Sequence, residues 1–157
     1  MRLYRIGRLE YLEDYRGLAA SYRDGGRWNE AGIPALYFAE TASVAMLEMA
    51  NYLPSPRLVP SSYRLGIYEL ADDTPMDRWP VTELPADWRH FPYPKSTRRL
   101  GTDWLIRGEG HLLAVPSAAI PAGLETVVLT SPARIGAESI RLIGMEADIY
   151  NPRAFVR

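Results

Sequence analysis

The stretch that decides the fold of this 157-residue chain is Gly25-Gly26-Arg27-Trp28-Asn29, followed after a few residues by Ala35-Leu36-Tyr37-Phe38-Ala39. Two consecutive glycines permit a tight turn and a close approach of backbone segments, so the turn can hold Arg27 at a fixed point. The second segment has the length and composition of a β-strand, in which alternate side chains point to opposite faces. We therefore expect Tyr37 to face the opposite side of a sheet from its two neighbours.

A helix is predicted next, over Thr41–Leu53, with Thr41 as its N-cap and Pro54 ending it. The segment is apolar on nearly every face, which is typical of a buried helix. Glu48 is its only charged residue. Carboxylates are almost never fully buried without a partner. Glu48 therefore either lines a cleft or lies in a structural ion pair or at a gap open to solvent.

The rest of the chain is a mixture of strands and one more helix, which favours one α+β domain over residues 1–157. A helix over Ser96–Arg107, capped by Ser96 or Thr97, ends before Gly108. The Pro-rich stretches 53–56 and 79–94 are expected to be surface connections. The predicted strands are Leu3–Ile6, Leu36–Ala39, Tyr63–Leu70, Leu112–Val115, Thr126–Thr130 and Ile140–Ile143.

Composition excludes several classes of function. The net charge of −1 gives no field that would attract nucleic acid or an anionic membrane. No apolar run approaches the ~20 residues needed to cross a bilayer. The absence of cysteine excludes disulfides and thiolate metal sites, and it fits a cytoplasmic protein. His90 and His111 have no second ligand at a useful spacing, so no metal site is expected.

Each candidate residue also has a simpler interpretation. Arg27 could face water at the tip of a hairpin, and Tyr37 could be a strand aromatic whose hydroxyl is satisfied locally. Ser117, in Val115-Pro116-Ser117, could be a turn serine bonded to nearby backbone. The functional alternative for Ser117 is a polar contact to a ribose or a phosphate.

Taken together, the motifs resemble the RES-domain family, which is named for an Arg, a Glu and a Ser. The resemblance extends from Leu3 to about Pro121 and maps these three residues to Arg27, Glu48 and Ser117. Its motifs are Gly25-Gly26-Arg27-Trp28-Asn29, Gly32, Ala35-Leu36-Tyr37, Ala45-Met46-Leu47-Glu48, Gly101-Thr102-Asp103-Trp104-Leu105 and Val115-Pro116-Ser117.

The resemblance implies a fold similar to that of ADP-ribosyltransferase toxins, with a split mixed β-sheet around an NAD⁺ cleft. It also implies a toxin of a type II toxin–antitoxin pair, with an Xre-like antitoxin and a homodimer within the complex. Known members of the family degrade NAD⁺ by cleaving the nicotinamide–ribose bond, through hydrolysis or phosphorolysis, and at least one kind ADP-ribosylates a protein instead. This chemistry requires no metal.

The resemblance further implies a role for each site residue. Glu48 would stabilise the positive charge that grows on the ribose in an oxocarbenium-like transition state. Arg27 would hold the pyrophosphate, and Tyr37 would pack on the nicotinamide ring. Trp28 would form a wall of the cleft, and Ser117 would bind near the nicotinamide ribose.

One stretch departs from the family pattern. Many members carry an Asn-Tyr-Leu-Leu-Asn-Pro run after the Val-Pro-Ser segment, whereas residues 125–132 here are Glu-Thr-Val-Val-Leu-Thr-Ser-Pro. Both asparagines are absent. This leaves open whether water, phosphate or a protein accepts the ADP-ribose, and it also leaves the antitoxin contacts open.

Three alternatives to NAD⁺ degradation remain. A mono-ADP-ribosyltransferase that modifies a cellular protein would use the same residues and needs an acceptor surface. A small RNA-cleaving toxin is disfavoured by the net charge and by the lack of a basic stripe, since Arg98-Arg99 is only a pair. An inactive module that only binds its antitoxin is disfavoured by the intact Arg27, Tyr37 and Glu48.

Overall fold

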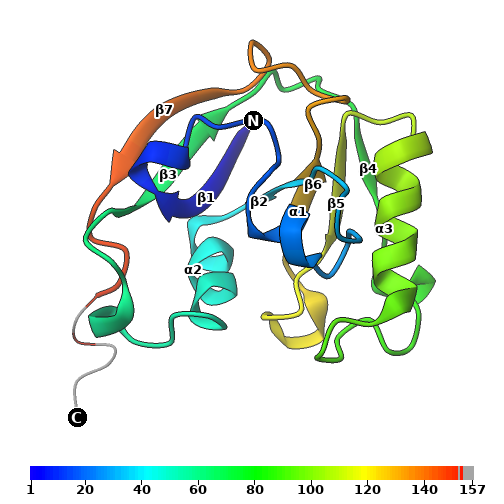
Figure 1. Cartoon of the computed structure of the whole chain (residues 1–157), viewed down its shortest axis with the longest axis horizontal. Coiled ribbons are helices and arrows are strands. Elements are labelled where there is room, and N and C mark those ends of the chain that lie inside the picture. The colour runs from blue at the N-terminus through cyan, green and yellow to red at the C-terminus, as the bar shows by residue number, and fades with distance from the viewer. Residues whose placement is uncertain (152, 154–157) are drawn as a thin grey trace.

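The computed structural model describes residues 1–151 and 153, and within them seven strands form one sheet in the order β4-β5-β6-β2-β1-β3-β7 (Figure 1). The β4–β5 pair is parallel, and all the other neighbours are antiparallel. The sheet is therefore mixed, as the family resemblance implied. The strands are β1 (Arg2–Arg8), β2 (Leu36–Ala39), β3 (Tyr63–Glu69), β4 (Met76–Arg78), β5 (Leu112–Pro116), β6 (Thr126–Thr130) and β7 (Arg141–Glu146).

The sheet is split in its middle. Strands β1 and β3 pair along their whole length, from Arg2 opposite Glu69 to Arg8 opposite Tyr63. By contrast, β1 and β2 pair only where Tyr4 lies opposite Ala39. The two halves of the sheet diverge from this point (Figure 1). The expectation of a split mixed sheet in an α+β domain is confirmed.

Both faces of the sheet are covered by apolar packing. In β2, Leu36 and Phe38 belong to one core cluster, while Tyr37 and Ala39 pack in the cluster on the other face. Strand β5 is buried along its whole length. Alternation therefore places Tyr37 on the face of the sheet opposite to its neighbours, as expected for a strand. Both faces of β2 pack against other parts of the protein.

Helix α2 (Ala42–Ala50) packs against β1, β2 and β6, at the split in the sheet. The Thr41 side chain accepts a hydrogen bond from the Val44 N–H, which confirms Thr41 as the N-cap. The helix ends at Ala50 instead of continuing to Leu53. The expectation of a fully buried helix was wrong, because Leu47 is 46% exposed. A helix with apolar residues on every side gives no indication of which side packs against the sheet and which side faces solvent.

Helix α3 (Lys95–Arg107) covers the β4–β5 half of the sheet (Figure 1). Pro94 occupies its N-cap position, so the predicted capping by Ser96 or Thr97 was wrong. The Ser96 hydroxyl instead donates to Asp87, outside the helix. Gly108 is the C-cap, as predicted. Proline has no backbone N–H. At the start of a helix this costs no hydrogen bond, because N–H groups there have no acceptor within the helix.

Several elements were not predicted. They are the short helix α1 (Ala20–Asp24), strand β4, and the 3-10 turns η1 (Leu9–Tyr11), η2 (Pro56–Leu58), η3 (Val81–Glu83) and η4 (Pro121–Gly123). Elements of three to five residues are too short to show a period in the sequence. The prediction that residues 79–94 form a surface connection was wrong in one respect, since Trp88 is buried in the core. Strand β7 also begins and ends later than the predicted Ile140–Ile143.

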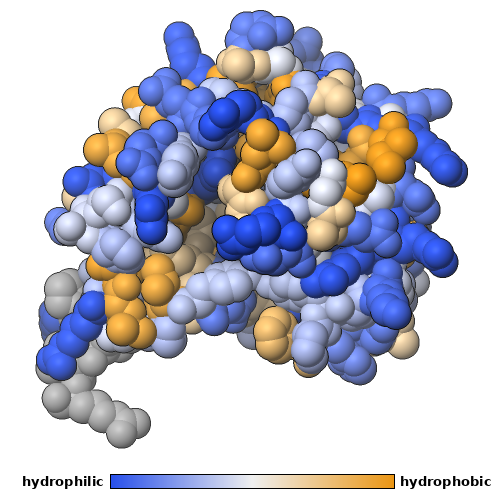
Figure 2. Space-filling model, viewed as in Figure 1, coloured by the Kyte–Doolittle hydropathy of each residue, from blue (hydrophilic) through white to orange (hydrophobic). Residues whose placement is uncertain are grey.

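One face of the molecule is mainly polar. Figure 2 shows hydrophilic residues over most of one face, with hydrophobic residues in small separate groups. In the part of the chain that the structure describes, no helix has both the length and the apolar character needed to span a bilayer.

Candidate functional site

A cavity of about 800 Å³ lies beside the split in the sheet. Strands β1 and β2, helix α2 and the turn after α1 form its walls, and the connection around Tyr93 forms part of its rim. Arg27, Trp28, Tyr37 and Glu48 all belong to its lining. Residues that were singled out in three separate stretches of sequence therefore meet around one space.

Ser117 is not part of the lining but lies directly behind Glu48. Its hydroxyl donates a hydrogen bond of 2.5 Å to Oε1 of Glu48. Ser117 is fully buried, and its backbone N–H donates to the Glu125 carbonyl at 2.8 Å. Glu48 itself is only half-buried. One carboxylate oxygen is thus held by the protein, and the Glu48 side chain borders the cavity without an ion-pair partner in the described residues.

Tyr37 is held beneath the glycine turn. Its hydroxyl donates to Oδ1 of Asn29 at 2.6 Å and accepts from the Trp28 N–H at 3.2 Å. Burial raises the pKa of Tyr37 well above its ordinary value, while the bond from the Trp28 N–H acts in the opposite direction. The phenol therefore stays protonated at neutral pH and acts as a donor to Asn29.

The paired glycines allow this arrangement. A Cβ atom on Gly26 would lie 2.7 Å from both the Tyr37 hydroxyl and Oδ1 of Asn29. Gly25 has a φ of +78°, a conformation that residues with a side chain rarely adopt. The Asn29 side chain donates in turn to the carbonyls of Ser21, Glu30 and Ile33, which ties the turn to its surroundings.

Helix α3 supports the same turn from outside. A Cβ atom on Gly101 would lie only 1.9 Å from the Trp28 carbonyl oxygen, so only glycine lets the helix approach this closely. The Thr102 hydroxyl accepts from the Glu30 N–H at 2.9 Å. The Gly101-Thr102 pair therefore positions the turn that carries Arg27 without itself reaching the cavity.

The Arg27 guanidinium is anchored on one side and free on the other. Its Nη1 donates to the Trp88 carbonyl at 2.5 Å and to the His90 carbonyl at 2.9 Å. Its Cζ lies 5.0 Å from the centre of the Tyr93 ring. Burial lowers the pKa of Arg27 from its ordinary value, although Tyr93 and Glu48 act in the opposite direction. A partly desolvated cation without a carboxylate partner favours binding of an anion.

Trp28 forms part of the wall of the cavity, on the side of the core. Its side chain is 1% exposed and meets Trp79 edge to face, with the ring centres 6.0 Å apart. The indole therefore belongs mainly to the core, and its backbone N–H serves the Tyr37 hydroxyl.

The sequence did not identify the residues at the rim of the cavity. The hydroxyls of Tyr52, which follows α2, and Tyr93 are in hydrogen-bond contact, and both residues line the cavity. Arg98, in the first turn of α3, lines it too. Tyr52 and Tyr93 are 41 residues apart, so no spacing rule could have joined them. The only available signal was the density of aromatic and arginine residues between Trp88 and Arg98.

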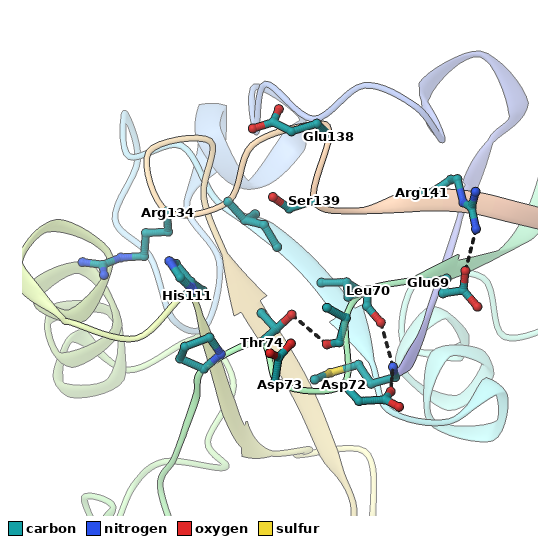
Figure 3. A pocket seen from close by; sticks show the side chains of 14 residues that line it. Glu69, Leu70, Asp72, Asp73, Thr74, His111, Arg134, Glu138, Ser139 and Arg141 are labelled. Atoms are coloured by element: carbon teal, nitrogen blue, oxygen red, sulfur yellow. Dashed lines mark hydrogen bonds and ion pairs between the residues drawn. The ribbon is translucent and has the colours of Figure 1, made fainter.

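A second depression, of about 790 Å³, lies at another edge of the sheet and differs in character (Figure 3). Its charged groups are largely engaged with one another, since Arg141 pairs with Glu69 and the amino terminus pairs with Asp72. Arg134 extends away from it and donates to carbonyls at the end of α3, including those of Trp104 and Leu105. In the described part of the chain, no cluster of His, Cys, Asp or Glu could hold a metal ion at either place.

The RES-domain family model matches residues 2–146 of the chain. The chain belongs to the RES-domain family. The resemblance drawn from the glycine turn, Tyr37 and Glu48 is therefore confirmed as family membership.

The matches between this RES protein and two curated relatives span most of both chains. "Toxin Res" of Yersinia enterocolitica is 35% identical over 133 residues, which span 84% of each chain. The "Prs ADP-ribosylating toxin" of Sphingobium sp. is 32% identical over 143 residues, 90% of this chain and 86% of the relative.

A solved structure shares the fold of this RES domain. It is the Mycobacterium tuberculosis MbcT–MbcA toxin–antitoxin complex, a chain of which superposes with a TM-score of 0.69 at 18% identity. The match covers 92% of this chain and 81% of the other. At this level of identity the comparison supports the fold alone.

Proposed function

We propose that this protein is the toxin of a toxin–antitoxin pair, and that it degrades NAD⁺ by cleaving the nicotinamide–ribose bond. The proposal rests above all on one observation: a single cavity is bordered by a serine-held carboxylate, Glu48, and a partly desolvated arginine, Arg27. The names of the relatives support the toxin assignment.

The reaction breaks the bond between nicotinamide N1 and C1′ of the ribose, and the electron pair leaves with neutral nicotinamide. Positive charge then grows on the ribose, and a fixed carboxylate stabilises it more in the transition state than in the ground state. We assign this role to Glu48, because Ser117 limits its motion. An acceptor oxygen, from water or phosphate, forms the new bond to C1′ and releases a proton.

The other residues bind and orient the substrate. Arg27 offers Nε and Nη2, which make no hydrogen bond within the described residues, to the pyrophosphate. Tyr37 presents its ring to the cavity while its hydroxyl is held by Asn29, so we assign to it packing against nicotinamide. Trp28 shapes the wall from the core. Ser117 acts by positioning Glu48 and lies at the ribose end of the site. This chemistry requires no metal.

The test is proton NMR of the purified protein with NAD⁺, with and without phosphate. We expect free nicotinamide from the native protein and a loss of about 10²–10³ in rate for Glu48→Gln. Glu83→Gln is the matched control, because Glu83 is an exposed carboxylate outside the cavity. Faster release in phosphate would identify a phosphorylase. Full activity in a folded Glu48→Gln variant would refute the assignment.

Transfer of ADP-ribose to a protein is the second candidate, and the name of the Sphingobium relative favours it. It uses the same bond cleavage but has a protein side chain as acceptor. Labelled NAD⁺ added to a cell lysate with the native protein would label a band if this candidate is correct. The Glu48→Gln variant would leave that band unlabelled.

We also propose an Xre-like antitoxin as partner and a homodimer within the complex, in the cytoplasm, without direct contact to nucleic acid or membrane. Co-expression with an Xre-like protein encoded beside the toxin gene tests the partner, and its absence there would argue against this pairing. Light scattering of the purified complex gives the number of copies. An RNA-cleaving toxin or an inactive binding module becomes the better interpretation if neither nicotinamide release nor protein labelling is observed.

A further inference from the structure

Arg98 lies in the same cavity as Arg27 and Glu48, although in the sequence it stood out only as half of the Arg98-Arg99 pair. It is half-buried in the first turn of α3, whereas its neighbour Arg99 is exposed and does not line the cavity. The helix therefore directs one arginine of the pair into the site and the other into solvent.

The position of Arg98 is coupled to that of Arg27. Its Nε donates to the Gly26 carbonyl at 3.1 Å, in the turn that carries Arg27. The Cζ atoms of Arg27 and Arg98 lie 5.0 Å and 5.8 Å from the centre of the same Tyr93 ring. Both guanidiniums therefore lie beside the Tyr93 ring, which itself lines the cavity.

Both arginines keep unused donors. Neither forms an ion pair with a carboxylate among the residues described. Nη1 and Nη2 of Arg98 make no hydrogen bond there, and neither do Nε and Nη2 of Arg27. Other arginines of the chain do have carboxylate partners, such as Arg16 with Asp14 and Arg78 with Glu40. Two cations that line one cavity without ion-pair partners favour an anion with at least two charges.

We propose that Arg98 is a second phosphate-binding residue, which together with Arg27 makes the cavity selective for a diphosphate-bridged dinucleotide over a mononucleotide. The inference rests on the proposed function for its substrate, but the binding of a diphosphate does not depend on cleavage. Arg27 alone serves one phosphate, and Arg98 adds the donors that match the second.

The test is calorimetric titration with ADP-ribose, which carries two phosphates, and with AMP, which carries one. We expect the native protein to bind ADP-ribose more tightly than AMP. Arg98→Gln should lower affinity for ADP-ribose about tenfold or more and reduce that preference, while Arg99→Gln should match the native protein. Arg98→Lys should recover part of the affinity, because it keeps the charge.

Several outcomes overturn the inference. Unchanged ADP-ribose affinity in Arg98→Gln does so. An equal loss for ADP-ribose and AMP does so too, because it would indicate a disturbed turn. If Arg98→Lys is as weak as Arg98→Gln toward both ADP-ribose and AMP, the Nε bond to Gly26 is the relevant contact, and Arg98 is structural. Thermal unfolding of each variant shows whether the fold is retained.

The same variants separate this inference from the proposed function. Binding of ADP-ribose that depends on Arg98, in a protein that releases no nicotinamide, supports the diphosphate site and refutes NAD⁺ cleavage. Normal cleavage with an unchanged KM for NAD⁺ in Arg98→Gln supports the function and refutes the role of Arg98.

Discussion

The Ser117 hydroxyl donates a 2.5 Å hydrogen bond to Oε1 of Glu48, across 69 positions of sequence. It also accepts from the Ala119 N–H at 3.2 Å, so its orientation is set on both sides. The serine is fully buried, while the glutamate borders the cavity. This geometry supports a positioning role for Ser117, whereas the sequence suggested contact with the ribose.

Ser117→Ala should therefore lower kcat for NAD⁺ cleavage by about 10- to 100-fold, because a misplaced catalytic group loses rate at this scale. KM should change little, since the serine does not hold substrate. Steady-state kinetics of nicotinamide release measure both values. Ser43→Ala, an exposed serine on the same helix as Glu48, is the control. A raised KM at unchanged kcat would instead support direct contact with the ribose.

Tyr37→Phe should destabilise the protein by about 1–3 kcal/mol, because it leaves Oδ1 of Asn29 and the Trp28 N–H without their partner in a buried place. Urea unfolding followed by tryptophan fluorescence measures this change. Tyr22→Phe is the matched control, since the Tyr22 hydroxyl makes no hydrogen bond in the described structure. Equal stability of the two variants would show that the hydroxyl network contributes little.

Arg27→Lys should raise KM for NAD⁺ about tenfold while the protein stays folded. Lysine keeps the charge but cannot bridge the Trp88 and His90 carbonyls and still present two further donors to a phosphate. Initial rates over a range of NAD⁺ concentrations give the KM. Arg99→Lys, outside the cavity, should behave as the native protein does. A normal KM in Arg27→Lys would mean that charge alone is sufficient.

Gly101→Ala should destabilise the protein by at least about 1–3 kcal/mol, since the added methyl group overlaps the Trp28 carbonyl and must push α3 away from the turn. Gly7→Ala is the control, because the nearest atom to the position that its methyl group would take is 3.9 Å away. Thermal unfolding compares the two. If Gly101→Ala is as stable as Gly7→Ala, the helix and the turn are not tightly coupled.

Much of the fold follows from local pattern. The strands β1, β2, β3, β5 and β6 and the Thr41 cap agree with prediction within a residue or two, because alternation and capping act over short distances. The ends of α2 and α3 were less well predicted. Their limits depend on what packs against them, as Pro94 in the N-cap position of α3 illustrates.

Some residues of the candidate site could also be identified from local sequence, and others could not. Arg27, Tyr37 and Glu48 stand out in the sequence because a paired glycine, a short strand and a lone charge are local signals. Arg98 does not, since its importance comes from the Gly26 carbonyl, 72 positions away along the chain. The Arg98–Gly26 bond exists only once α3 packs on the turn.

Local sequence was enough to indicate five of the seven strands, the glycine turn, the family and the residue types that chemistry on a nucleotide would need. Only the tertiary structure decided that Ser117 lies behind Glu48, that α2 keeps one exposed side, and that Arg98 enters the cavity while Arg99 does not. These features differ because the interactions behind them act over different distances along the chain. Backbone propensity acts within a few residues, whereas burial, hydrogen bonding and charge pairing depend on which surfaces the whole chain brings together.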